Sequence, residues 1–169
     1  LMPMPEEKIF IIAEGGVNHN GSVDLGMKLV EAAAAAGADA VKFQIFKAER
    51  IISRLAAKAA YQVRATGDQE GQLDMVRRLE LPPEAHEQLA ACCRDHRIQF
   101  LSTPFDPESV DLLVQLRVKS IKISSGDITN APLLVKIART GLPAILSTGM
   151  STLGEVETAL GILAFGYLD

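Results

Sequence analysis

The chain has 169 residues, of which 48% are hydrophobic and 22% are charged, and its formal net charge is −4. This length is sufficient for one domain with a sizeable core, and the composition excludes the disordered and fibrous classes. The acidic balance, without a run of basic residues, predicts no nucleic-acid partner. No apolar stretch reaches the roughly 18 residues of a membrane span and no signal pattern opens the chain, so we expect a cytoplasmic protein with no membrane contact.

Five short apolar runs, rich in β-branched residues, alternate with amphipathic stretches along the sequence. This alternation is typical of βαβ units and of a parallel sheet. Because each run is continuously apolar, we expect parallel strands that are buried on both faces. The strands are predicted at residues 9–13, 40–44, 98–102, 120–123 and 144–147.

Capping signals mark where the intervening helices begin and end. The starts are marked by Ser22, Pro83, Asp106 with Pro107, Pro132, and Thr152 with Glu155; the ends are marked by Gly37, Gly141 and the neighbourhood of Gly161. The inward faces are predicted to carry Leu25, Leu29, Ala32, Ala33 and Ala36 in the first helix, Ala85, Leu89 and Cys93 in the second, and Val110, Leu113, Val114 and Leu116 in the third.

One segment, residues 45–81, is far longer than the usual connection of about 2 to 6 residues between a strand and a helix. Such long excursions are usually functional. Its middle, 64–71, is polar, and short helices are predicted at 56–61 and 73–79. The charged residues near its end, Arg77, Arg78 and Glu80, are expected to form a solvated face.

The histidines and cysteines give weaker signals. The turn at 18–21 contains His19, a minor functional candidate, while His86 and His96 are expected to face solvent or a helix end. Three scattered histidines predict no metal site within this segment. Cys92 and Cys93 are adjacent on a predicted helix, where a mutual disulfide would be strained, so both are expected to be reduced.

Every predicted strand ends in polar or chargeable residues. The ends carry Glu14; Lys42 and Gln44; Ser102, Thr103 and Phe105; Lys122, Ser124, Ser125 and Asp127; and Ser147 and Thr148. A lysine inside an apolar strand requires an anionic partner, so Lys42 and Lys122 predict a site for a phosphate or a carboxylate. Two simpler interpretations stay open: Lys42 and Glu14 form a structural ion pair, and the single hydroxyls satisfy local backbone groups.

Two α/β architectures accommodate five parallel units. A flavodoxin-like sheet closes its core with five strands, whereas a (β/α) barrel needs eight strands and typically about 250 residues. Length favours the open sheet. Polar residues at all five strand ends favour the barrel, because an open sheet concentrates its site at one switch point. We therefore predict a parallel (β/α) TIM-type barrel of which about five βα units are present.

Six motifs carry a family resemblance: Ile-Ile-Ala-Glu at 11–14, Gly-Val-Asn-His-Asn-Gly at 16–21, Gly-Ala-Asp-Ala-Val-Lys-Phe-Gln at 37–44, Phe-Leu-Ser-Thr-Pro-Phe-Asp at 100–106, Lys-Ile-Ser-Ser-Gly-Asp-Ile-Thr-Asn at 122–130 and Leu-Ser-Thr-Gly-Met at 146–150. Together they resemble the sialic acid synthase (N-acetylneuraminate synthase) family over almost the whole chain. That family condenses phosphoenolpyruvate (PEP) with an N-acylated amino sugar such as N-acetylmannosamine. The products are a nine-carbon 2-keto sugar acid and phosphate, and a divalent metal, Mn²⁺ or Mg²⁺, assists.

The resemblance implies a role for each residue at the strand ends. Lys42, Thr103, Lys122, Ser125 and Ser147 match positions that bind PEP; Gln44, Phe105 and Asp127 match positions near the sugar; and Glu14 matches a catalytic carboxylate beside the reacting carbons. Two positions depart from the family. Gly15 stands where a bulky apolar residue is usual, and Asp127 stands where a glutamate is usual, so the acceptor sugar stays open.

The resemblance also implies that residues 1–169 are the N-terminal portion of a single (β/α)8 barrel. The remaining strands, the metal ligands and any C-terminal antifreeze-like domain would then follow residue 169, and residues 1–169 alone would be inactive. The complete enzyme is expected to be a homodimer. Two alternatives stay open: a Schiff-base aldolase that uses Lys122, and a non-catalytic five-stranded module.

Overall fold

The computed structural model describes residues 9–53, 56–57, 63–64 and 71–169. Its strands are β1 (Ile12–Gly16), β2 (Ala40–Ile45), β3 (Gln99–Pro104), β4 (Ile121–Ile123) and β5 (Ala144–Leu146). Its α-helices are α1 (Val23–Ala35), α2 (Ala48–Ile51), α4 (Gln72–Arg77), α5 (Pro83–Asp95), α6 (Pro107–Gln115), α7 (Ala131–Arg139) and α8 (Leu153–Leu168), with a short 3₁₀ helix, η1 (Ser125–Asp127).

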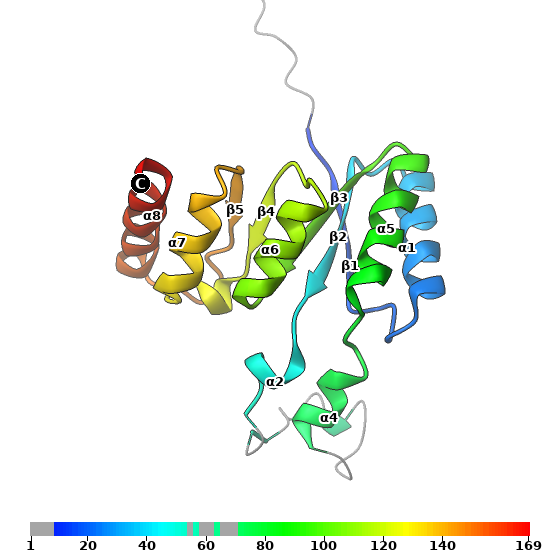
Figure 1. Cartoon of the computed structure of the whole chain (residues 1–169), viewed down its shortest axis with the longest axis horizontal. Coiled ribbons are helices and arrows are strands. Elements are labelled where there is room, and N and C mark those ends of the chain that lie inside the picture. Colours follow the sequence, from blue (N-terminus) through cyan, green and yellow to red (C-terminus); the bar gives the residue numbers. More distant parts are fainter. Residues whose placement is uncertain (1–8, 54–55, 58–62, 65–70) are drawn as a thin grey trace, which may run out of the picture.

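The strands form two hydrogen-bonded groups, β1–β2–β3 and β4–β5, and the neighbours within each group are parallel. β4 lies beside β3 (Figure 1), where Gln99 Nε2 donates to Ser120 Oγ over 3.0 Å. The strands alternate with helices along the chain. The predicted parallel α/β class is therefore confirmed.

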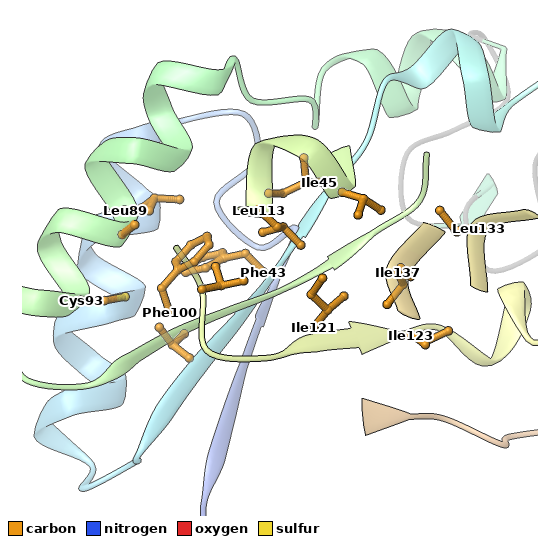
Figure 2. Close-up of a cluster of buried hydrophobic side chains, with 14 of the residues drawn as sticks. Phe43, Ile45, Leu89, Cys93, Phe100, Leu113, Ile121, Ile123, Leu133 and Ile137 are labelled. Carbon is orange, nitrogen blue, oxygen red and sulfur yellow. The ribbon is translucent and has the colours of Figure 1, made fainter. Parts of the chain in front are cut away.

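One face of the sheet packs against the long helices. Figure 2 shows Phe43 and Ile121 from the strands meeting Leu89, Leu113 and Ile137 from α5, α6 and α7, and all five side chains are fully buried. Successive side chains of a strand point to opposite faces. The opposite face therefore receives the residues that alternate with this apolar set.

A second, smaller core lies past the carboxyl ends of β1, β2 and β3, where α2 and α4 sit apart from the other helices (Figure 1). Its buried members are Phe46, Ala48, Leu73, Met75 and Val76, and Val17, Ile51, Ile52, Leu79 and Phe105 pack against them. The helix predicted at 73–79 is confirmed as α4. The helix predicted at 56–61 and the polar stretch 64–71 lie largely outside the described residues.

The predicted helix starts are confirmed. The side chains of Ser22, Asp106 and Thr152 each accept a backbone hydrogen bond from the first turn of α1, α6 and α8, and Thr152 forms a full capping box. The last helix is longer than predicted, because it continues past Gly161 to Leu168. Open space surrounds the Cα of Gly161, so this glycine costs helix propensity without forcing an end.

Two strand predictions were wrong in part. The first strand begins at Ile12 rather than at residue 9, and Ile9, Phe10 and Ile11 are 80%, 52% and 55% exposed. Its ladder with β2 starts only where Ile12 meets Ala40. The last strand is not buried on both faces, because Ile145 is 38% exposed.

The predicted inward faces of two helices were also wrong in part. In α1, Leu25 is 41% exposed and Ala32 and Ala36 are exposed too, whereas Gly26 is buried; in α6, Val114 is 46% exposed. A Cβ at Gly26 would lie 2.8 Å from Cδ2 of Leu89. The missing side chain therefore lets α5 approach α1. With this close contact, the buried face of α1 is shifted by one residue from the predicted one.

His86 was predicted to face solvent or a helix end, and the solvent-facing prediction was wrong, since the side chain is 2% exposed. Burial, followed by the nearby charges of His19 and Lys47, lowers its pKa from 6.5 to about 4. His19 is buried too, and its Nδ1 accepts from the backbone N–H of Gly21 over 3.1 Å. Both cysteines are free, as predicted.

No helix within the described residues is long and apolar enough to cross a membrane.

Candidate functional site at the strand ends

The open face of the sheet, which no helix among the described residues covers, carries the chargeable side chains. Lys42 alternates with the core residues Val41 and Phe43, and Lys122 alternates with Ile121 and Ile123. The register places Glu14 opposite Lys42 and Gln44 opposite Thr103. Parallel neighbours point to the same face. The predicted site residues of four strands therefore share one surface, namely Glu14, Lys42, Gln44, Thr103 and Lys122.

Glu14 and Lys42 form an ion pair at the ends of β1 and β2. The Nζ of Lys42 lies 2.9 Å from Oε1 and 2.8 Å from Oε2 of Glu14. The lysine side chain is only 12% exposed, whereas the glutamate side chain is 58% exposed. A bulge between Glu14 and Gly16 interrupts the ladder here, and bulges can re-aim a neighbouring side chain. The carboxylate thus reaches solvent while it compensates a buried cation.

Lys122 is held differently. Its Nζ donates to the hydroxyl of Ser147 over 2.5 Å and to the carbonyl oxygen of Ile123 over 3.0 Å. Burial lowers the pKa of Lys122, the positive charge of Lys42 lowers it further, and the negative charge of Glu14 opposes both. The three ionisable groups therefore act on one another across the open face.

This electrostatic arrangement favours an anionic ligand. Two lysines face one carboxylate, and Lys122 has only neutral hydrogen-bond acceptors in the part of the chain that the structure describes. A partly buried cation whose hydrogen-bond partners are all neutral is costly, and the nearby charge of Glu14 offsets only part of that cost. A phosphate or carboxylate beside Lys122 would remove that cost.

Hydroxyl and amide groups surround the lysines. Thr103 is 3% exposed and lies opposite Gln44, so its side chain is buried within the open face. Ser125, in η1, lies beside the turn that follows β5, because a Cβ at Gly149 would be 3.5 Å from its Oγ. Ser124, by contrast, accepts from the backbone N–H of Gly126 over 3.2 Å and serves its own turn.

Asp127 and Phe105 flank this group. Burial raises the pKa of Asp127, and a hydrogen bond of 3.2 Å from Asn130 Nδ2 opposes that shift. The ring of Phe105 packs edge-on against Phe46, with ring centroids 6.4 Å apart, as part of the smaller core.

The structure thus brings some predicted site residues into direct contact and leaves others apart. Glu14 touches Lys42, and Lys122 touches Ser147. Within the described residues, no hydrogen bond connects Ser125 or Asp127 to either lysine. They reach the same region only through η1, which follows directly from β4.

Gly15 leaves no room for the bulky apolar residue that is usual at this position in the family that the sequence resembles. A Cβ at this position would lie 2.9 Å from Cε1 of Phe43 and 3.2 Å from the carbonyl oxygen of Lys42. Phe43 is fully buried, so its ring cannot move aside. The departure at Gly15 therefore fits the packing of this core.

The described residues do not provide a metal site by themselves. No three His, Cys, Asp or Glu side chains among them converge closely enough to hold an ion. Glu14 is the carboxylate paired with a site lysine, whereas Asp127 lies in η1 and has no hydrogen bond or ion pair to either lysine among the described residues.

Sequence reasoning missed Glu80, which was assigned to a solvated face. Its carboxylate binds Lys47 Nζ at 2.6 Å and accepts from the backbone N–H of Ala48 at 2.9 Å. Its neighbour Arg77 does lie on an exposed face, paired with Glu49 at 2.7 Å. No local pattern signals the Glu80 contact, because its partners lie more than 30 residues away.

Comparison with known proteins places the chain in a family. The model of the NeuB family matches residues 29–166. The N,N'-diacetyllegionaminic acid synthase of Campylobacter jejuni is 55% identical over 157 residues, which cover 93% of this chain and 47% of that protein. The enzyme of the same name from Legionella pneumophila is 48% identical, over 89% of this chain and 42% of its own.

A solved structure agrees in fold. The N-acetylneuraminic acid synthetase of Leptospira borgpetersenii, crystallised with citrate, matches with a TM-score of 0.80 and 31% identity, over 95% of this chain and 52% of that chain. The fold is accordingly part of a parallel (β/α) barrel, as predicted, rather than a flavodoxin-like sheet. The chain spans about half the length of the curated relatives that it matches. On the family match over most of its residues, the chain belongs to the NeuB family.

Proposed function

We propose that the protein condenses PEP with the open-chain aldehyde of an N-acylated amino sugar, giving a nine-carbon 2-keto sugar acid and inorganic phosphate. In this proposal the chain supplies the N-terminal part of one barrel. The observation that carries the proposal is the open face of the sheet, where Lys42 and Lys122 lie near one carboxylate, Glu14. Membership of the NeuB family supports the same reaction class.

The residue types suit PEP, which carries a phosphate and a carboxylate. Lys122 and Ser147, with Ser125 nearby, would bind one anionic group, while Lys42 and Thr103 would bind the other. Two cations that each hold one anionic group would fix the orientation of PEP as well as its position. Carbon 3 is thereby presented to the aldehyde, and the developing charge is met by donors that are already in place.

The acceptor sugar would lie toward Gln44, Phe105 and Asp127, which we call the acceptor side. Carbon 3 of PEP forms a bond to the aldehyde carbon, and the aldehyde oxygen takes up a proton. Water then adds to carbon 2, and the bond between carbon 2 and the phosphate oxygen breaks as the keto group forms. Glu14 is exposed enough to meet that water and would accept its proton.

A divalent metal, Mn²⁺ or Mg²⁺, is part of the proposal. Its ligands would lie outside the described residues, because the described ones do not form a metal site. A metal would polarise the aldehyde. The complete enzyme is proposed to be a homodimer.

The acceptor sugar is to be identified by an activity assay with several candidate sugars. Relatives that cover most of this chain are named for N,N'-diacetyllegionaminic acid, and the matching Leptospira structure is named for N-acetylneuraminic acid. Candidate acceptors are therefore N-acetylmannosamine, its 6-phosphate and a diacetamido hexose.

Phosphate release from PEP tests the proposal. The longest natural form of the protein is incubated with PEP, Mn²⁺ and each candidate sugar in turn. Release that requires both the metal and one sugar is expected. Absence of release with every sugar would reject the synthase.

A Schiff-base aldolase remains the second candidate, and the lowered pKa of Lys122 favours it because a neutral amine is the nucleophile of that chemistry. Borohydride reduction in the presence of pyruvate would attach a three-carbon label to Lys122, which peptide mass spectrometry detects. An unlabelled Lys122 would reject the aldolase.

A further inference from the structure

The start and the end of the 45–81 segment are tied together beside the acceptor side. Glu80, at the end, binds Lys47 Nζ at 2.6 Å and caps the first amide of α2, that of Ala48, at 2.9 Å. The Glu80 side chain is 20% exposed and the Lys47 side chain is 46% exposed, so the ion pair is partly shielded from water. Partly buried, charge-assisted hydrogen bonds are stronger than exposed ones.

Asp106 connects Lys47, at the start of this segment, to β3 and α6. Its carboxylate accepts from the backbone N–H of Lys47, from the backbone N–H of Ser109 and from the hydroxyl of Ser109, each over 2.9 Å. Asp106 is 3% exposed. We call Lys47, Ala48, Glu80 and Asp106 the basal clamp.

The basal clamp lies directly against the acceptor side. Phe105 precedes Asp106, and its N–H donates to the carbonyl oxygen of Ile45 over 3.1 Å, which prolongs the pairing of β2 and β3 beyond Gln44. The ring of Phe105 then rests on Phe46, which is 6% exposed. Both Gln44 and Phe105 are thus one to three residues from the clamp along the chain.

The smaller core also docks onto β1. Val17 packs against it, and the carbonyl oxygen of Arg78 approaches so closely that a Cβ at Gly21 would lie 2.2 Å away. Gly21 has a φ of +78°, a conformation that glycine adopts without strain. The helices α2 and α4 therefore rest on the ends of three strands, and the clamp fixes them there.

We propose that Glu80 and Asp106 are positioning residues for the acceptor sugar: by holding residues 46–48 against the end of β3, they fix Phe105 and Gln44 in the geometry that the sugar requires. The inference rests on the proposed function. Lys42 and Lys122, proposed to bind PEP, lie on strand residues that the parallel ladders hold, and Lys42 is two residues farther from the clamp than Gln44, so the clamp acts more on the sugar than on PEP.

The test compares Glu80→Gln with Glu49→Gln in the longest natural form of the protein. Both variants remove one carboxylate charge from the same segment, but Glu49 pairs with Arg77 on an exposed face, with side chains 53% and 44% exposed. In Glu80→Gln the KM for the sugar should rise about tenfold while the KM for PEP changes less than twofold. Glu49→Gln should leave both values unchanged.

A second readout does not depend on turnover. In Glu80→Gln, backbone amide hydrogen exchange should become faster at Ala48, Lys47 and Phe105, while the core amide of Val30 keeps its protection. Lys47→Met removes the other partner of the ion pair and should reproduce the pattern.

The outcomes separate the two proposals. Equal rises in the KM values for PEP and sugar, or equal effects of the Glu80 and Glu49 variants, would overturn the positioning role. If the wild-type protein releases no phosphate with any sugar, the proposed function fails and the sugar role fails with it. Hydrogen exchange then tests only the structural part, that the clamp holds Phe105: unchanged exchange at Phe105 in both Glu80→Gln and Lys47→Met would reject it.

Discussion

The two faces of the sheet are built from alternate residues of the same strands, yet their chemistry is opposite. On the helix-covered face, Phe43 and Ile121 are fully buried among apolar side chains. On the open face, their chain neighbours Lys42 and Lys122 carry charge. A strand can therefore use one face for packing and the other for ligand binding, because successive side chains point to opposite faces.

The comparison predicts that substitutions separate cleanly by face. A change on the open face should affect ligand binding or turnover more strongly than the free energy of unfolding. A change on the helix-covered face should do the reverse.

The largest effect is expected for Glu14→Gln. If Glu14 handles the proton of the attacking water, kcat should fall about 10² to 10⁴-fold. Glu14→Gln should also lower the free energy of unfolding, because Lys42 is only 12% exposed and loses its partner, but by less than the roughly 3 kcal/mol of a fully buried pair, since Glu14 is 58% exposed. Steady-state phosphate release measures kcat, and thermal unfolding measures stability.

Glu157→Gln is the matched control, because Glu157 is an exposed glutamate on α8, far along the chain from the strand ends. It should leave kcat unchanged. A Glu14 variant that keeps its turnover would show that the ion pair with Lys42 is structural only.

On the helix-covered face, Leu89→Ala should lower the free energy of unfolding by about 3 kcal/mol, since the removed side chain is fully buried against Gly26. Urea denaturation measures the loss. The affinity of the folded protein for PEP should not change. Leu25→Ala is the control, and as Leu25 is 41% exposed, it should cost well under the Leu89 value.

If Leu25→Ala and Leu89→Ala lowered the free energy of unfolding equally, Leu25 would face the core, as sequence periodicity predicts for α1. That result would contradict the packing described above.

Lys122→Met should weaken PEP binding roughly 10 to 100-fold, the range for losing a hydrogen bond to a charged group. The methionine fills similar volume, and removing a partly buried cation spares its desolvation, so the free energy of unfolding should stay the same or rise. Isothermal titration calorimetry with PEP measures the affinity. Unchanged PEP affinity would place the ligand elsewhere on the molecule.

Local signals in the sequence were sufficient for most of the fold. N-cap residues and first-turn prolines act within one helical turn, so the starts of α1, α5, α6 and α8 could be predicted from Ser22, Pro83, Asp106 and Thr152. The charged residues of the open face stood out because Lys42 and Lys122 interrupt apolar strands. Periodicity was less reliable, since a single small residue, Gly26, rotates the buried face of α1.

Contacts between distant segments could not be predicted. Glu80 and His86 both looked solvated in the sequence, yet Glu80 binds Lys47 and His86 is buried. For His86 a signal existed, because Leu89, Ala90 and Cys93 continue an apolar stripe from that position at helical spacing. For Glu80 there was none, since its role depends on how the two ends of a long connection meet.

The smallest effect concerns the pH dependence of PEP binding, and it tests whether the lysines of the two strand groups share one electrostatic site. Binding requires the charged form of Lys122, whose pKa burial and Lys42 lower, so affinity should decline as the pH rises through a value below that of an ordinary lysine. Lys42→Met removes a like charge and should move this decline to higher pH. Glu14→Gln removes an opposite charge and should move it to lower pH. Calorimetric titrations with PEP across the alkaline range measure the midpoint, whatever the absolute affinity of each variant. Shifts in the same direction, or none, would mean that Lys42 and Glu14 do not share a site with Lys122.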